Sequence, residues 1–430
     1  MAEAMHLREG LVRTIGRWSL TALMVNSIIG VSIFRLPADL AAKLGGVSPL
    51  SCVAAGVGIL FIAGCIAEVS SYFCETGGLY LYARETFGRF AGLLVGWLTW
   101  LTRIAAPAAA ANLFCTYLAY FFPSVAGRGF EVLVIALLIG HLALVNYVGV
   151  TAGKNVSNLF TGIKVGFLLL FVLVGLFALM ARPEIRVPIT FPPTSSKNWF
   201  EAMLLLVYAY GGFEGALFVG GETKNPKRDT PVALLSALAL VCVVYTSIQF
   251  VTVTTLPDAG SSAQPLSMAA MRIVGPAGGK VMTLAALLSA YGYLSANLLH
   301  APRLTFAMAE QGDFPGFLAA VHPRHRTPFV SILVYGVLVF IFAALGTFEW
   351  NAVLSAVARL AVYGTMAVAV PVLRRARPGG ASFLLPAPYL FAGIGAIFAG
   401  VLLTQMGWGE FVVIGTTCAI ALVNWIVVRG

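Results

Sequence analysis

A succession of long apolar runs leaves this chain few ways to fold. Hydrophobic residues make up 59% of its 430 residues and charged residues only 10%, against roughly 25% charged residues in a soluble domain. A run of about 20 apolar residues spans a bilayer as an α-helix. The composition therefore excludes a soluble globular fold and predicts an all-α membrane protein with twelve transmembrane helices. The expected spans are 18–41, 50–73, 88–121, 130–148, 155–181, 198–221, 231–256, 280–308, 328–346, 350–373, 385–405 and 408–428.

Two of these runs are interrupted by polar residues and glycines. The first interruption lies in Val25–Pro37 and the second in Tyr208–Gly215, about five spans later. Lipid cannot satisfy free backbone N–H and C=O groups, so unwound backbone at membrane depth either lines a cavity or is buried in protein. Paired interruptions in two halves of a chain indicate the substrate site of a transporter. A pair of glycine kinks tolerated by helix packing is the alternative.

The basic residues of the expected loops predict how the chain crosses the membrane. With both termini in the cytoplasm, sixteen of the 27 Lys and Arg residues fall on the cytoplasmic side, seven fall outside and four lie within spans. This imbalance follows the positive-inside rule and explains the net charge of +10 without a nucleic-acid partner. Residues 1–17 are expected to form a cytoplasmic tail, with no cleaved signal peptide. We therefore expect a multi-pass protein of the cytoplasmic membrane.

Other classes of membrane protein find little support in the sequence. A channel would usually show a filter motif or a ring of charges, and an embedded enzyme would need a catalytic constellation within its spans. His141 and His300 are isolated and lack ligand spacing, and no phosphate-binding Gly-x-x-x-x-Gly-Lys motif occurs. We expect no metal, no cofactor and no use of ATP, and we expect the six scattered cysteines to be free thiols.

Four motifs follow one another along the chain. They are Gly30–Phe34 with Pro37, Glu75–Tyr82 with Phe87-Gly88, Phe213-Glu214 with Glu222–Pro231, and Arg303 with Ala307–Ala309 and Gly312–Pro315. In this order they resemble the amino acid–polyamine–organocation (APC) permeases, and the resemblance runs over roughly residues 15–375. One position departs from the pattern: the family usually has Gly-Ser-Gly at the first break, whereas this chain has Gly30-Val31-Ser32. Ser32 is the candidate to replace the missing hydroxyl.

The resemblance implies a transporter of the LeuT architecture, in which helices 1 and 6 are broken at the membrane centre. Helices 1–5, at about 18–181, and helices 6–10, at about 198–373, would form two inverted repeats. Residues 18–373 would then be the transport core, and residues 385–428 would be helices 11 and 12. Such a protein moves a small substrate across the bilayer by alternating access.

A free amino acid presents a carboxylate and an ammonium group, and each break offers a partner for one of them. The N-terminus of a half-helix has unpaired N–H groups and a positive dipole end, which suit the carboxylate. Freed carbonyls where the first halves end, at Ile28, Tyr208 and Gly211, suit the ammonium. Asn297 resembles a pathway-lining position, although a buried Asn that bonds to another helix is the equal alternative. The expected binding residues are Ser27, Ile28, Gly30, Val31, Ser32, Ile33, Tyr208, Tyr210, Gly211 and Asn297.

Lys164 lies about nine residues inside its span, too deep for its side chain to reach the interface easily. The resemblance adds that sodium-independent members carry a lysine on helix 5 where sodium-coupled relatives bind a cation, and Lys164 matches this position. We expect Lys164 to tie the first break to the fifth helix, to be able to lose a proton, and to have Glu214 as a partner.

Glu214 follows the second break directly. An ionised carboxylate there is costly unless it is paired or hydrated, so Glu214 is either a proton carrier or gate, or a structural residue bonded to nearby backbone. Phe213 is expected to gate or to cover the substrate, with packing as the alternative. Arg103 and Arg359 lie deep in spans, where each pairs with Glu68 or another acid or lines a watery vestibule.

The expected substrate is a neutral L-amino acid. Gly211 and Gly212 are expected to leave space for its side chain, and the two deep arginines disfavour a dicationic polyamine, since like charges repel strongly in low dielectric. A cationic amino acid or polyamine exchanger is the alternative. Transport is expected to be independent of sodium and driven by protons or by exchange.

Overall fold

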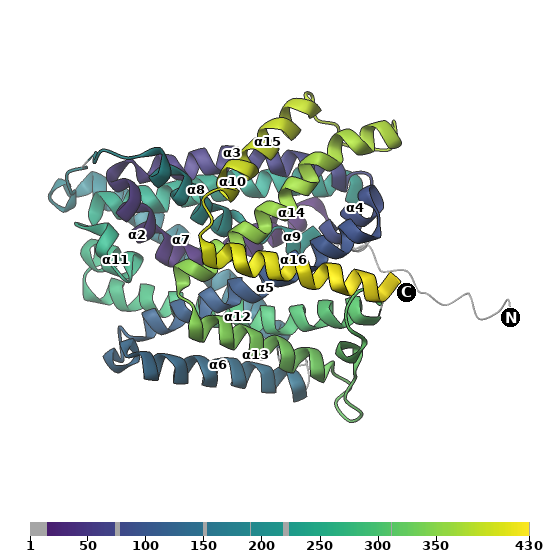
Figure 1. Cartoon of the computed structure of the whole chain (residues 1–430). Coiled ribbons are helices and arrows are strands. Elements are labelled where there is room, and N and C mark those ends of the chain that lie inside the picture. The colour runs from purple at the N-terminus through teal and green to yellow at the C-terminus, as the bar shows by residue number, and fades with distance from the viewer. Residues whose placement is uncertain are drawn as a thin grey trace.

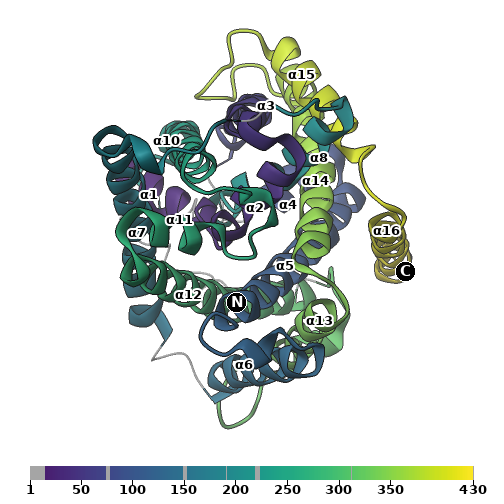
Figure 2. The same ribbon diagram turned by 90° about the vertical axis from the view of Figure 1, so that its left-hand side faces the viewer.

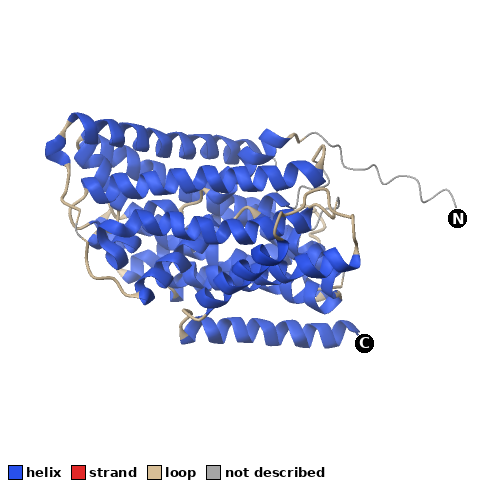
Figure 3. Ribbon diagram, turned by 90° about the horizontal axis from the view of Figure 1, so that it is seen from above, coloured by secondary structure: helices blue, strands red, loops and turns tan. Residues whose placement is uncertain are grey.

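The structure, a computed structural model, describes residues 15–73, 78–148, 153–189, 191–217, 223–310 and 312–429. These residues form helices and connecting loops, with one isolated β-bridge between Ile15 and Thr223 (Figure 3). The all-α class is therefore confirmed. The expected motif residues 75–77 and 222 lie outside the described residues.

The helices follow the apolar runs closely, since a run of 20 or more apolar residues satisfies its backbone within one helix. In the first half they are α1 Arg17–Ile28, α2 Ser32–Leu44, α3 Ser48–Ser70, α4 Gly78–Phe87, α5 Arg89–Leu118, α6 Arg128–Val148 and α7 Gly153–Ala181. In the second half they are α8 Ser196–Tyr210, α9 Glu214–Leu217, α10 Pro226–Thr255, α11 Pro265–Val274, α12 Pro276–Glu310, α13 Phe329–Leu345, α14 Phe348–Ala376, α15 Pro388–Leu403 and α16 Trp408–Arg429 (Figure 1).

Eight segments of the described chain are long and apolar enough to cross a membrane, with α2 and α3 counted as one continuous segment. Three further apolar helices, α11, α13 and α15, are shorter. The protein is thus a multi-pass membrane protein, and the count of twelve spans stays a prediction. The short helix α11 was not expected. Between α12 and α13 the chain forms a short 3₁₀ turn, Gly316–Ala319.

The broken helices lie inside the bundle. Helix α1 packs against α10, and α2 packs against α8, while α3 packs against both α8 and α10. Helices α5, α12 and α14 form a wall beside them, and α6 and α13 lie side by side at one edge of the bundle (Figure 2). Helix α16 lies at another edge, on α5. This arrangement places both breaks away from the lipid-facing surface.

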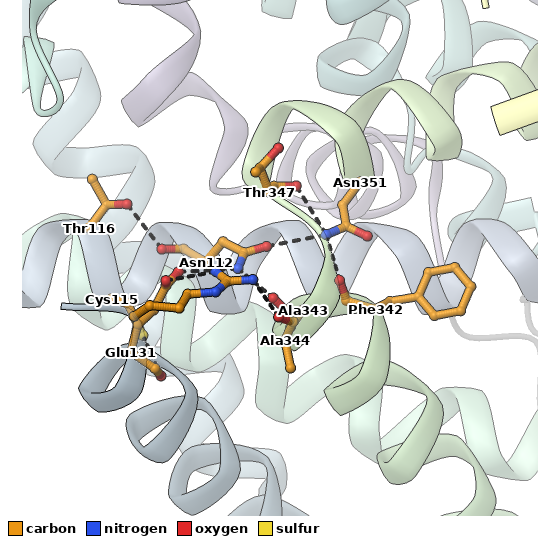
Figure 4. Close-up of polar contacts among 10 residues, drawn as sticks. Asn112, Cys115, Thr116, Glu131, Phe342, Ala343, Ala344, Thr347 and Asn351 are labelled. Carbon is orange, nitrogen blue, oxygen red and sulfur yellow. Dashed lines mark hydrogen bonds and ion pairs between the residues drawn. The ribbon is translucent and has the colours of Figure 1, made fainter. Parts of the chain in front are cut away.

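A buried amide network joins the outer wall helices (Figure 4). The Asn112 side chain on α5 donates to the carbonyl of Ala343, at 2.9 Å, and accepts from Asn351 on α14, at 3.2 Å. The same Asn351 amide also donates to the carbonyls of Phe342 and Thr347, at 3.1 and 3.0 Å. These bonds tie the turn between α13 and α14 to α5, and they add to the backbone bonds that the Phe342 and Thr347 carbonyls accept from Gly346 and Asn351 N–H.

Two of the four sequence motifs meet at the end of the bundle that carries α4. The Tyr80 hydroxyl and the Arg84 and Arg89 guanidiniums all contact the carboxylate of Asp313, with Arg84 and Arg89 each at 3.3 Å. Asp313 is only 1% exposed. Burial and the hydrogen bond to Asp313 raise the pKa of Tyr80 to about 12, so its hydroxyl stays protonated and keeps donating. Asp313 thus fixes the chain after α12 to the start of α5.

Candidate functional site

The first break separates α1 from α2 and is fully enclosed by protein. Helix α1 ends at Ile28 and α2 begins at Ser32, with Val31 as its N-cap. Gly30 N–H donates to the Ile28 carbonyl at 2.6 Å, which closes a tight turn. Val31 is 1% exposed. A half-helix therefore begins directly after this break, at Ser32.

The second break separates α8, which ends at Tyr210, from α9, which begins at Glu214. Gly212 has a φ of +111°, a left-handed conformation that only glycine adopts without strain. A Cβ atom at Gly212 would lie 2.3 Å from the Ser27 carbonyl oxygen. The two breaks are thus in backbone contact, and a glycine is required where they touch.

The glycines of the second break do not leave space for a substrate side chain, so that prediction is wrong. A Cβ atom at Gly211 would lie 2.2 Å from Arg359 Nη1, and Gly212 faces Ser27 as described. These glycines allow the close approach of a guanidinium and of backbone. Gly30 differs, because a Cβ atom there would make only ordinary contacts, 3.7 Å from the Ile28 oxygen and 3.9 Å from Tyr293 Cε2. A Cβ atom therefore fits at Gly30 but not at Gly211 or Gly212, and we call the space that it would take, next to Tyr293, the room beside Gly30.

A buried ion pair closes the second break. Arg359 Nε lies 2.9 Å from Glu214 Oε1, and its Nη1 donates to the Tyr208 carbonyl at 3.0 Å. The other carboxylate oxygen of Glu214 accepts from Gly212 N–H at 2.8 Å and from the Tyr363 hydroxyl at 3.0 Å. Arg103 Nη2 is also near, 3.7 Å from where a Cβ of Gly215 would lie. This pair, with its hydrogen bonds, satisfies the charges that membrane burial would otherwise penalise.

Two of the three carbonyls expected to bind an ammonium already have partners. The Tyr208 carbonyl accepts a hydrogen bond from Arg359, as described above. The Ile28 carbonyl accepts from Gly30 N–H and lies 3.1 Å from the Tyr245 hydroxyl. The same hydroxyl lies 3.2 Å from the Ala209 carbonyl. A side chain of α10 therefore bridges the ends of both first half-helices, and the expected ammonium partners at Ile28 and Tyr208 are occupied by protein.

Lys164 is 7% exposed and donates from Nζ to the Asn26 carbonyl at 3.3 Å. It connects α7 to the last turn of α1, next to the first break, which is the expected link. The prediction that Glu214 is the partner of Lys164 is wrong, because Glu214 pairs with Arg359.

The three aromatics of the second break point in different directions. Tyr210 donates to the Cys52 carbonyl of α3 at 2.8 Å, and Phe213 is 0% exposed and stacks on Tyr363 with ring centroids 5.3 Å apart. Both pack away from Gly30. The Tyr208 ring lies against Phe348, at 6.1 Å, with Arg359 over it at 6.0 Å.

Side chains of α12 border the room beside Gly30. The Tyr293 ring faces it, and Asn297 donates from Nδ2 to the Tyr293 carbonyl at 2.9 Å, within its own helix. Both residues are half-buried. Ser27 donates to the Leu23 carbonyl at 2.8 Å, also within its own helix. The bond that Asn297 makes is therefore not the helix-to-helix bond of the alternative reading.

The other deep charges have structural partners. Glu68 binds Arg374 through both oxygens, at 2.6 and 2.8 Å, and accepts from Leu385 N–H at 2.9 Å. Arg35 pairs with Asp39 at 2.9 Å. Among the described residues no group of three or more His, Cys, Asp or Glu side chains could hold a metal ion.

Sequence reasoning missed Tyr245 and Tyr363, and it named Arg359 without its partner. Each is a tyrosine within an apolar span, and this could have indicated a buried hydrogen bond, since a buried hydroxyl needs a partner. Nothing in the sequence shows which partner it finds.

The amino acid permease family model matches residues 15–427, nearly the whole chain. This chain belongs to the amino acid permeases. It is 30% identical to the methylthioribose transporter of Bacillus subtilis over 94% of this chain and 91% of that protein. It is 26% identical to a branched-chain amino acid permease of the same organism, over 93% and 89% of the two chains. It is 31% identical to a serine/threonine exchanger of that organism, over 76% of each. The permease is a membrane transporter of the APC superfamily, as the four motifs indicated.

Proposed function

We propose that this permease is a secondary active transporter that moves a neutral L-amino acid across the cell membrane by alternating access. The observation that carries the proposal is the contact between the two breaks at Gly212 and Ser27, inside a family of amino acid permeases. Unwound backbone is tolerated at membrane depth when it is buried in protein or lines a cavity, and two breaks that meet provide one shared site.

The helix contacts support the proposed inverted repeats. If spans 1–5 and 6–10 are equivalent, each contact between the halves should have a counterpart in which the two halves exchange places. The pair α1 and α10 corresponds to α8 and α3, and the pair α5 and α14 corresponds to α12 and α7; all four pairs are in contact. The twelve-span count follows from taking α1 with α2, and α8 with α9, as the two broken spans. Both termini would lie in the cytoplasm.

The room beside Gly30 supports a neutral substrate. It is bordered by the Tyr293 ring, and the substrate carboxylate would face the N-terminus of α2 at Val31, Ser32 and Ile33. Glu214, which directly follows the second break, is already paired with Arg359, and this disfavours a cationic side chain or a second ammonium group of the substrate.

The named relatives leave a second candidate substrate class. A cationic amino acid transporter of Mus musculus is 28% identical over 86% of this chain, which favours cationic amino acids as the alternative. The methylthioribose transporter shows that a relative of equal similarity is named for a substrate that is not an amino acid.

Coupling follows from Lys164 and Glu214. Lys164 supplies a fixed cation against the first break, so transport would not need sodium. Glu214 holds Arg359 and the turn of the second break together, which suits a gate that positions α9 better than a proton carrier. The driving force would be a proton gradient or exchange against internal amino acid.

A counterflow measurement tests the proposal. Proteoliposomes preloaded with one unlabelled amino acid should transiently accumulate the same labelled amino acid, and uptake should saturate. Candidates come from a thermal-shift screen against the twenty amino acids, common polyamines and methylthioribose. Labelled substrate that only equilibrates would indicate a channel, and a thermal shift with a polyamine or methylthioribose alone would overturn the substrate class.

A further inference from the structure

A second cavity lies apart from both breaks, where α2 ends and α8 and α14 begin. Its volume is about 340 Å³, and no residue of either break lines it. Lys43 closes one side, the loop before α16 closes another, and Leu204, Val353 and Trp350 form apolar walls.

The cavity carries more acid than base. Glu201, Glu349 and Glu410 line it, together with one basic residue, Lys43. Lys43 Nζ lies 3.0 Å from Glu201 Oε2 and 3.3 Å from Glu349 Oε1, so one ammonium group is shared by two carboxylates. Lys197 Nζ lies 3.7 Å from the other carboxylate oxygen of Glu201, so three carboxylates face two ammonium groups and one negative charge is left over.

Glu410 is the unpaired member of this set. It is 7% exposed, yet no hydrogen bond or ion pair reaches its carboxylate from the part of the chain that the structure describes. It stands in the first turn of α16, where the helix dipole favours a carboxylate in its charged form. A Cβ atom at Gly407 would lie 2.7 Å from Glu410 Oε2, so a glycine there gives the carboxylate its place. A buried carboxylate that faces a cavity and has no partner is stabilised when a cation binds beside it.

We propose that this cavity binds an organic ammonium compound, with the ammonium group on Glu410 and an apolar body against Trp350 and Leu204. The cavity already holds one ammonium group, that of Lys43. A metal ion would need several carboxylates converging on one point, and the two that converge do so on Lys43. The ring of Trp350 adds a surface to which cations are attracted.

The cavity also has a place in the transport cycle, an extension that rests on the proposed function. It is lined by residues of α2, α8 and α14, the helices that carry or flank the two breaks. A compound bound there holds these helix ends together. It should slow uptake without competing with the transported amino acid.

Benzylamine, which has one ammonium group and one aromatic ring, is a suitable probe. Isothermal titration of the purified permease should give saturable binding of benzylamine but not of benzoate. The Glu410→Gln variant should bind it at least about tenfold more weakly, because a charge-assisted bond is lost. Glu85→Gln, a carboxylate that pairs with Arg377 outside the cavity, is the control and should bind normally.

Further variants keep the outcome decisive. Gly407→Ala displaces the Glu410 carboxylate and should weaken binding even if Glu410→Gln fails to fold. Gly30→Leu should retain benzylamine binding while it loses uptake, which separates this site from the substrate site. Unchanged affinity in both cavity variants, equal binding of benzoate, or binding of calcium in place of benzylamine would each overturn the proposal.

Discussion

Gly212 and Gly30 lie at corresponding breaks, but only the position of Gly212 requires a glycine. Gly212 combines a positive φ with a carbonyl oxygen where its side chain would be, whereas a Cβ atom at Gly30 would make only ordinary van der Waals contacts. The sequence shows both as glycines in a polar interruption and cannot distinguish them, because the difference lies in what the other half of the chain places beside each. The positions of the breaks were predictable, and the direction in which the room opens was not.

A pair of alanine substitutions tests this difference. Gly212→Ala should lower the yield of folded protein and its melting temperature, since it adds both backbone strain and a clash with Ser27. Gly30→Ala should fold normally and reduce uptake of large substrates more than of small ones, because it narrows the room beside Tyr293. Thermal melts and uptake of a substrate series measure the two effects. Normal folding of Gly212→Ala would contradict the contact between the breaks.

The Glu214–Arg359 pair should behave as one unit. Glu214→Gln leaves an uncompensated guanidinium in the bundle and should destabilise the fold by about 3–5 kcal/mol. The double variant Glu214→Gln with Arg359→Met removes both charges and should recover a large part of that loss. Thermal unfolding of the single and double variants completes the cycle. Additive losses would show that the two charges act independently.

Among elements, the sequence predicted the long helices well, because an apolar run in lipid has one way to satisfy its backbone. It missed α11, a ten-residue helix, which is too short for that constraint to apply. It did not identify the partners of the charges inside spans: Glu68 or another acid was expected for Arg359, which pairs with Glu214. Arg374 and Glu68, or Arg359 and Glu214, lie far apart in the chain, and their pairing depends on how helices pack.

The link between α7 and α1 is tested by removing one amine. Lys164→Ala should lower the maximal rate of uptake while leaving substrate affinity within about twofold, because the binding backbone stays in place. Lys197→Ala, whose side chain is 76% exposed, is the matched control. Replacing sodium by choline should leave the rate of the unmutated permease unchanged. A strict sodium requirement would contradict the hypothesis that the Lys164 ammonium group replaces a bound cation.

The amide network between α5, α13 and α14 predicts a stability effect without a transport effect. Asn351→Leu removes the three side-chain hydrogen bonds to Asn112, Phe342 and Thr347 and leaves the buried Asn112 amide oxygen without this donor. The expected loss is roughly 1–3 kcal/mol, read as a lower melting temperature with unchanged substrate affinity. Thr404→Ala, at an exposed position, should change neither. A melting temperature equal to that of the unmutated protein would show that these bonds contribute nothing.

For the whole molecule, the motifs that identified the family also meet in space. Tyr80 and Asp313 belong to two of them and are in contact, and a third motif reaches the N-terminal segment through the pairs of Ile15 with Thr223 and of Arg17 with Asp229. Family resemblance predicted the presence of these residues. Their function as clamps between distant segments could be seen only in the fold.

Opening the Asp313 clamp should therefore affect the molecule as a whole. Asp313→Asn leaves Arg84 and Arg89 without their shared carboxylate and frees the chain after α12 from the start of α5. Uptake and thermal stability should both fall, while binding of substrate to the detergent-solubilised protein should persist. Arg377→Gln, which removes an exposed pair with Glu85, gives the comparison. Full uptake by Asp313→Asn would show that the contacts of Asp313 are not needed for transport.

The contact between the breaks has a further consequence for how the polypeptide can be assembled. Residues 191–193, which are exposed, lie in the segment that connects the two halves of the chain, whereas Gly212 and Tyr245 join the second half to the first break. The covalent link between the halves is therefore dispensable once these contacts have formed. Two genes, encoding residues 1–191 and 192–430, should yield fragments that associate in the membrane into a working transporter.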